Sequence, residues 1–169
     1  MKKIVTKIAL LLGFPLILMS LIGGDRVKNK AFSKLLDSLL DHSVPEITIS
    51  EVEEDSVIFL DARAFAEYQV SHLKNAQHVG YESFNLESVS TISKDAPIVV
   101  YCSVGYRSEK VAKKLCNAGF TNVKNLYGGI FEWKNQDKKV FTDSLETQQI
   151  HAYSKTWGIW LNKGEKVYK

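Results

Sequence analysis

The chain is poor in the residues that build metal sites and disulfide frameworks. It has two cysteines, Cys102 and Cys116, three prolines and four scattered histidines, and it has no C-x-x-C pair. Without clustered cysteine and histidine ligands no zinc site is predicted, and we expect neither a metal nor a cofactor. Cys116 falls well along a helical stretch that starts just after Cys102. A rise of about 1.5 Å per residue then keeps the two thiols too far apart for a disulfide.

Strong charge of either sign is also lacking. The formal net charge is +3 over 169 residues and the lysines are scattered, which argues against a groove that binds nucleic acid. The sequence contains no internal repeats and no low-complexity segments. Its length suits one domain with a substantial core.

The one long apolar run opens the chain. Three lysines within Met1–Lys7 precede an almost wholly apolar stretch, Ile8–Ile22. This order is typical of a signal peptide or signal anchor, which we assign to residues 1–24. We therefore expect an exported protein, either periplasmic or anchored to the inner membrane through this segment. Basic residues flank both sides of the run and no A-x-A-like site follows it, so orientation and cleavage stay open.

Residues 25–44 lead into the domain. Apolar side chains between Val27 and His42 recur on one side of a helix, with polar residues on the other. This spacing predicts an amphipathic helix. We expect its apolar face to pack on the domain, and a partner-binding face is the alternative.

A strand, a short loop and a helix surround Cys102. The run Ile98–Tyr101 is rich in β-branched residues and predicts a buried parallel strand, and Glu109–Ala118 has helical periodicity. Cys102 would then lie between a strand end and a helix N-terminus, where a thiolate is stabilised. Gly105 lets the loop curl its N–H groups inward, and Arg107 adds a positive charge. The alternative is an inert cysteine at the end of a core strand.

This loop carries a resemblance to a known family. Cys102–Ser108 reads CSVGYRS and resembles the C-x-x-G-x-R-S active-site loop of rhodaneses, which are sulfurtransferases. Three further stretches resemble the family's other motifs and occur in its order. They are Ile58–Arg63 followed by Glu67 and Tyr68, His72–Ala76, and Asn125–Trp133. Together the four motifs place a rhodanese domain at residues 45–135.

The fold expected from these observations is α/β. Short apolar strands alternate with helices, which predicts a parallel sheet covered on both faces. The resemblance implies the rhodanese fold, with a small parallel central sheet, helices on both faces and Cys102 at the carboxyl edge. Residues 136–169 form an extension with five aromatic side chains, too aromatic for a disordered tail, and we expect it to pack on the domain. A sharper hypothesis is that His151–Trp160 borders the active-site mouth and selects substrates.

The resemblance implies sulfur transfer through a persulfide. The Cys102 thiolate would take the outer sulfur of thiosulfate or of a persulfide and pass it to a thiol or to cyanide. The predicted active-site loop is Ser103, Val104, Gly105, Tyr106, Arg107 and Ser108, with Asp61, Arg63 and Glu67 as supporting residues. We expect backbone N–H groups of the loop to stabilise the sulfur anion, and Arg107 to brace the loop through a carboxylate such as Glu67.

The middle of this loop lacks the extra basic side chains that help some relatives to bind thiosulfate. A larger or less charged donor, or a partner protein's persulfide, therefore stays open.

Two other functions compete with sulfur transfer. Cysteine phosphatases use C-x₅-R loops, but only four residues separate Cys102 from Arg107, and the smaller ring of N–H groups suits one sulfur better than a phosphate. A non-catalytic partner-binding module of the cell envelope is the second alternative. The presence of Cys102, Gly105 and Arg107 argues against it.

Overall fold

The computed structural model describes residues 26–143 and 145–169, so the predicted signal or anchor segment, residues 1–24, lies outside the described part. The helices are α1 (Lys30–Leu39), α2 (Phe65–Val70), α3 (Tyr106–Asn117), α4 (Gly129–Asn135) and α5 (Lys155–Gly158). Short 3₁₀ turns occupy Ile49–Glu51, Glu54–Ser56 and Leu86–Val89. Within residues 26–143 and 145–169, no helix is both long enough and apolar enough to cross a membrane.

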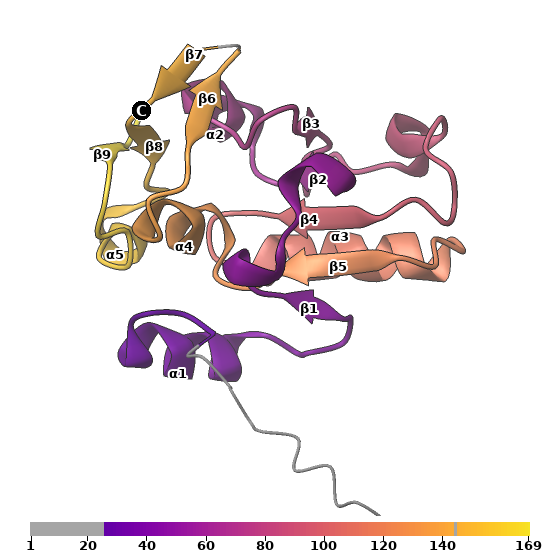
Figure 1. The fold of residues 1–169 in the computed structure, drawn as a ribbon, viewed down its shortest axis with the longest axis horizontal. Coiled ribbons are helices and arrows are strands. Elements are labelled where there is room, and N and C mark those ends of the chain that lie inside the picture. The colour runs from indigo at the N-terminus through magenta and orange to yellow at the C-terminus, as the bar shows by residue number, and fades with distance from the viewer. Residues whose placement is uncertain (1–25, 144) are drawn as a thin grey trace, which may run out of the picture.

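A five-stranded parallel sheet organises the molecule (Figure 1). Its strands are β1 (Glu46–Ile47), β2 (Ile58–Asp61), β3 (Gln77–His78), β4 (Ile98–Tyr101) and β5 (Val123–Leu126). Their spatial order is β1-β5-β4-β2-β3, and every pair is parallel. This confirms the predicted α/β fold with a parallel central sheet, and it places β4 in the middle.

The two faces of the sheet carry separate apolar clusters. Along β4, Val99 and Tyr101 belong to one cluster, whereas Ile98 and Val100 belong to the other, as the two-residue period of a strand requires. Helices α1 and α4 pack on the first cluster through residues such as Leu36 and Ile130. Helix α3 packs on the second cluster through Val111, Ala112 and Leu115. Both faces are therefore covered by helices, as predicted.

Some element boundaries differ from the predictions. Helix α1 is shorter than the amphipathic stretch Val27–His42, and the chain enters a 3₁₀ turn at Ile49, soon after β1 ends at Ile47. The reason is local, because Glu51 accepts hydrogen bonds from the N–H and hydroxyl groups of Thr48. Helix α3 begins at Tyr106 rather than after Ser108. The last three residues of the predicted active-site loop are therefore the first turn of this helix.

The C-terminal extension adds two small sheets, β6 (Val140–Thr142) with β7 (Leu145–Thr147), and β8 (Gln149–His151) with β9 (Glu165–Val167). Phe141 and His72 form an isolated antiparallel β-bridge, in which the N–H group of each residue donates to the carbonyl of the other. The ring of Trp160 stacks on that of Phe32 from α1, with ring centroids 5.3 Å apart. The extension thus contacts α1 through this stack, and Figure 1 shows α5, β8 and β9 beside α4.

Candidate active site

Cys102 follows directly after β4, at the carboxyl edge of the central sheet. Its side chain is only 1% exposed, and the N–H group of Gly105 donates a hydrogen bond to its sulfur at 3.2 Å. Gly105 has φ of 119°, a conformation that residues with a Cβ rarely adopt, and it precedes the twelve-residue helix α3. The sulfur therefore lies at the positive end of a helix dipole, where the first N–H groups of a helix have no partner within the helix.

Helix α4 holds this loop from behind. The N–H group of Ile130 donates to the carbonyl of Cys102 at 2.9 Å, and that of Phe131 donates to the carbonyl of Ser103 at 3.1 Å. The close approach requires Gly129, where an added Cβ would lie 2.4 Å from the Cys102 carbonyl oxygen. The pair of glycines at the start of α4 is visible in the sequence, but this contact with the Cys102 loop was not predicted.

A buried side-chain network fixes the start of α3. Ser108 donates its hydroxyl hydrogen to Asn125 Oδ1 at 2.6 Å, and Asn125 Nδ2 donates to the carbonyl of Gly105 at 3.1 Å. Asn125 is wholly buried in β5 and was not among the predicted site residues. Its signal in the sequence is an amide between Val123 and Leu126 in a short strand that packs into the core, because a buried amide needs hydrogen-bond partners.

Arg107 and Glu67 form the ion pair that the resemblance implies. Two guanidinium nitrogens of Arg107 donate to the two carboxylate oxygens of Glu67 at 2.6 and 2.9 Å. The hydroxyl group of Ser103 contacts both side chains, at 2.9 Å from Arg107 and 3.1 Å from Glu67. The first turn of α3 is thereby tied to α2 across the Cys102 loop.

The charges of this pair stabilise each other. Burial opposes ionisation of Glu67, but the hydrogen bonds and the charge of Arg107 outweigh burial, so the pKa of Glu67 lies below its ordinary value. Burial also opposes the charge of Arg107, but Glu67 and the neighbouring Cys102 raise its pKa above the ordinary value. Arg107 is therefore a permanent cation beside the Cys102 thiol.

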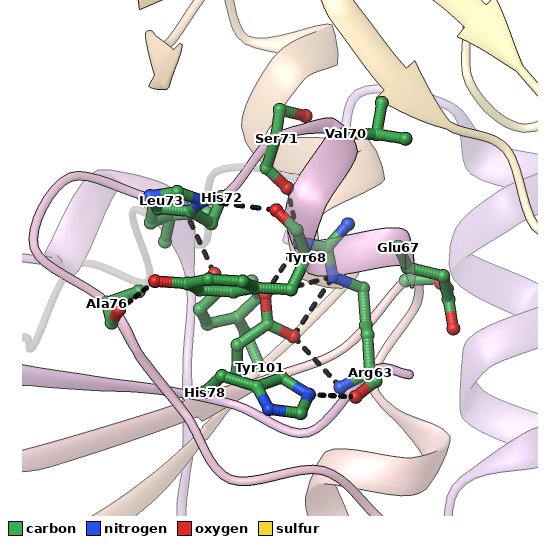
Figure 2. A network of polar contacts seen from close by, with 12 residues as sticks. Arg63, Glu67, Tyr68, Val70, Ser71, His72, Leu73, Ala76, His78 and Tyr101 are labelled. Carbon is green, nitrogen blue, oxygen red and sulfur yellow. Dashed lines mark hydrogen bonds and ion pairs between the residues drawn. The ribbon is translucent and has the colours of Figure 1, made fainter. Parts of the chain in front are cut away.

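Asp61 and Arg63 form a second pair, which is wholly buried. Figure 2 shows Arg63 within the network of polar contacts around it, close to Ser71 and Tyr101. Arg63 donates to both oxygens of Asp61, the shortest bond being 2.6 Å, and to the carbonyl of Ser71 at 2.6 Å. Although burial alone would lower the pKa of Arg63, Asp61 raises it above its ordinary value. This pair joins the end of β2 to the chain after α2, so it supports the site from inside the fold.

A cavity of about 670 Å³ lies above Cys102. The predicted site residues that line it are Cys102, Ser103, Val104, Tyr106, Arg107, Arg63 and Glu67. The other three, Gly105, Ser108 and Asp61, are not among its lining residues and act through the contacts described above. Leu39, Tyr153 and Trp157 also line the cavity, although they come from the two flanking segments. In the described part of the chain, no group of three or more potential ligands is placed to hold a metal ion.

Comparisons with known proteins place this geometry in a family. The family model of the Rhodanese-like domain matches residues 45–136. A tRNA uridine(34) hydroxylase from Hamiltonella defensa subsp. Acyrthosiphon pisum is 33% identical over 131 residues, which are 75% of this chain and 34% of that protein. A protein of the same name from Pectobacterium carotovorum is 33% identical over 91 residues, 51% of this chain and 26% of that protein. The chain thus spans about a third or less of the length of these relatives.

Solved structures agree in fold. The BH2092 protein from Bacillus halodurans superimposes with a TM-score of 0.54 at 25% identity, over 70% of this chain and 88% of that one. A thiosulfate sulfurtransferase from Pseudomonas aeruginosa superimposes with a TM-score of 0.55 at 24% identity, over 80% of this chain and 26% of that one. The matched residues include every predicted site residue, from Asp61 to Ser108. The chain therefore belongs to the rhodanese-like domain family.

Proposed function

We propose that the protein is a sulfurtransferase that carries sulfane sulfur as a persulfide on Cys102. The observation that carries the proposal is the position of the Cys102 sulfur. The sulfur accepts a hydrogen bond from the Gly105 N–H group at 3.2 Å. It lies at the start of α3 and on the floor of the cavity, and Arg107 lies beside it. These features favour a thiolate nucleophile and its charged product.

The reaction runs in two half-steps. The Cys102 thiolate attacks the outer sulfur of a donor, the S–S bond of the donor breaks, and the electron pair leaves with sulfite or with an organic thiolate. Cys102 is then a persulfide with one negative charge. A thiolate or cyanide attacks the terminal sulfur, the new S–S bond breaks, and the Cys102 thiolate is restored. Each half-step passes a sulfur atom from one nucleophile to another, so it needs no external oxidant or reductant.

The loop contributes electrostatic stabilisation. The negative charge moves by one sulfur atom during the first half-step, so it stays close to the Gly105 N–H group and to Arg107. Glu67 keeps the guanidinium group of Arg107 in place and offsets part of its charge. Asp61 and Arg63 act as structural support beneath the cavity.

The non-catalytic alternative makes a different demand on Cys102. A module that only binds a partner would work equally well with serine at this position, because serine has nearly the same shape.

We also infer from residues 1–24 that the domain works in the cell envelope. Fractionation of cells that express the full chain tests this placement, and recovery in the soluble cytoplasmic fraction would contradict it.

The test of the proposed activity is the intact mass of the full chain after incubation with thiosulfate or a small organic persulfide. The native protein should gain the mass of one sulfur atom, and a reducing agent should remove it. Cys102→Ser should gain nothing. Cys116→Ser is the matched control, because Cys116 is also a free thiol, and this variant should load sulfur as the native chain does. Loading that survives in Cys102→Ser would refute the proposal.

A further inference from the structure

The cavity above Cys102 is much larger than an inorganic donor needs. Its volume of about 670 Å³ falls in the range of pockets that hold drug-sized organic molecules. One water molecule takes up about 30 Å³ in the liquid, so the cavity corresponds to roughly twenty waters. A thiosulfate ion, with five heavy atoms, would leave most of this space as water.

The charges around the cavity do not favour a doubly charged anion. The charged residues among the described lining are Arg63, Arg107, Glu67 and Glu82, two of each sign. Arg107 is engaged by both oxygens of Glu67, and the buried guanidinium group of Arg63 is paired with Asp61. The formal charges of these lining residues cancel. Attraction by net charge therefore does not select the donor.

Large apolar side chains make up much of the cavity lining instead. The lining includes Leu39, Phe65, Tyr81, Tyr106, Tyr153 and Trp157. Three of the seven exposed large hydrophobic residues in the described part of the chain, Phe65, Tyr106 and Tyr153, belong to this set. Exposed apolar groups that gather at one opening, with polar groups below them, are typical of a binding site for an organic ligand.

Tyr153 is held in this position at a conformational cost. Its φ of 62° is left-handed, which a bulky side chain seldom adopts. Its N–H group donates to His151 Nδ1 at 3.1 Å, and its ring lies 5.1 Å from the guanidinium carbon of Arg107. The residue is nevertheless 53% exposed, so burial in the fold does not account for the strain. A ligand in the cavity would cover it.

We propose that this cavity selects organic sulfane-sulfur donors whose leaving group carries an aromatic or similarly bulky apolar substituent. The inference rests on the proposed sulfurtransferase function and names its donor class. In the transfer step the Cys102 thiolate attacks the outer sulfur of R–S–S⁻. The S–S bond breaks, R–S⁻ leaves with the electron pair, and Cys102 becomes a persulfide. The apolar group R remains against Tyr153 and Trp157 while the outer sulfur reaches Cys102.

The test compares two donors with the same reactive group. Benzenethiosulfonate and methanethiosulfonate both transfer their outer sulfur and release a sulfinate, but only the first carries an aromatic ring. Rates of Cys102 loading on the full chain are followed by intact mass, and the phenyl-to-methyl rate ratio is divided by the same ratio for N-acetylcysteine. This division removes the intrinsic difference between the donors. Partial burial of one ring should make the normalised ratio about tenfold or more.

Variants of the cavity lining test which side chains cause the preference for the phenyl donor. Tyr153→Asn removes the ring and keeps a residue that tolerates positive φ, and it should lower the normalised ratio at least about threefold. Trp157→Leu should lower the ratio as well. Ile159→Ala is the matched control, because Ile159 is 60% exposed in the same segment but does not line the cavity. Its ratio should equal that of the native chain.

Each outcome decides the inference. A normalised ratio near one, with both donors loading Cys102, would overturn the donor class and leave the sulfurtransferase function standing. A high ratio that persists in both Tyr153→Asn and Trp157→Leu would overturn the assignment to this cavity. If neither donor loads Cys102, the inference falls together with the proposed function.

Discussion

The floor and the rim of the cavity are built in different ways. The floor, residues 102–107, is held by backbone hydrogen bonds from α4 and by buried polar side chains. The part of the rim that Leu39, Tyr153 and Trp157 form is only partly covered, and it comes from segments outside the family match at residues 45–136. Backbone hydrogen bonds constrain positions tightly, whereas a rim of side chains tolerates substitution. Substitutions in the flanking segments can therefore alter which donor the cavity binds, while the floor keeps the same reaction at Cys102.

The largest effect should come from crowding the floor. In Gly129→Ala the added Cβ would lie 2.4 Å from the Cys102 carbonyl oxygen, at a residue with φ of 56°. Overpacking and the left-handed conformation together should lower the free energy of unfolding by about 3 kcal/mol. Chemical denaturation measures this loss, and sulfur loading of Cys102 should slow as well.

Gly119 is the matched control for that substitution. It also has a positive φ, 89°, but an added Cβ would meet nothing within 4 Å. Gly119→Ala should therefore cost only about 1 kcal/mol, the conformational part. Equal losses in the two variants would show that the contact between α4 and the Cys102 loop is not tight.

The next effect should come from the ion pair across the loop. Glu67→Gln leaves the Arg107 charge in a largely buried position, where its side chain is 17% exposed. Removal of one partner of a fully buried pair costs about 3–5 kcal/mol, and partial access of Arg107 to water should reduce this to about 2 kcal/mol.

An exposed pair provides the comparison for Glu67. Lys138 and Glu54 form an ion pair at 2.8 Å, with side chains 38% and 40% exposed. Glu54→Gln should change the free energy of unfolding by less than about 1 kcal/mol, because water already solvates both charges. A loss in Glu67→Gln no larger than that in Glu54→Gln would contradict the bracing role of Arg107.

Changes behind the rim should affect stability without affecting the chemistry. Trp160→Leu removes the stack on Phe32 and should cost about 1 kcal/mol. Because Trp160 does not line the cavity, loading of Cys102 by methanethiosulfonate should keep its rate within about twofold. A large fall in that rate would mean that the rim also positions the floor.

The smallest effect should be a pH dependence near the rim. Burial is the main cause that lowers the pKa of His151 below its ordinary value of 6.5, and Arg63 and Arg107 add to it although Glu67 opposes them. Below pH 6.5 the folded state then binds fewer protons than the unfolded state. The contribution of neutral His151 to the free energy of unfolding is therefore complete above pH 6.5 and is lost as the pH falls through the folded pKa. His151→Asn should remove that part of the pH dependence of unfolding.

His42 gives a control of opposite sign. Its hydrogen bonds to the Asp37 carbonyl and to Glu46 raise its pKa, so its contribution is complete below pH 6.5 and is lost as the pH rises through the folded pKa. His42→Asn, at a residue with positive φ, should remove this opposite slope. The lowered pKa of Glu67 adds a further loss of stability only below its ordinary value of 4.5, in more acidic solution. Identical slopes in the two histidine variants would contradict these assignments.

Local pattern and motif together predicted the central part of the molecule. Alternation of apolar strands and helices is enough to indicate a parallel sheet, because each element must bury one face. The C-x-x-G-x-R-S loop located Cys102 and Arg107, and the motif before it located Glu67. Boundaries were less accurate. Helix α3 starts at Tyr106, three residues before the predicted stretch from Glu109, because the ends of a helix depend on a few local hydrogen bonds.

What the sequence by itself determined is the parallel sheet, from local periodicity, and the position of Cys102 between a strand and a helix. The resemblance of its short motifs to the family implied the rest, namely Cys102 at the carboxyl edge and a carboxylate such as Glu67 as the partner of Arg107. Only the tertiary structure decided that Gly129 and Asn125 hold the floor from behind, and that Tyr153 meets Arg107 at the rim. Those contacts join residues far apart in the chain, and their geometry is set by how the layers pack, which no local pattern encodes.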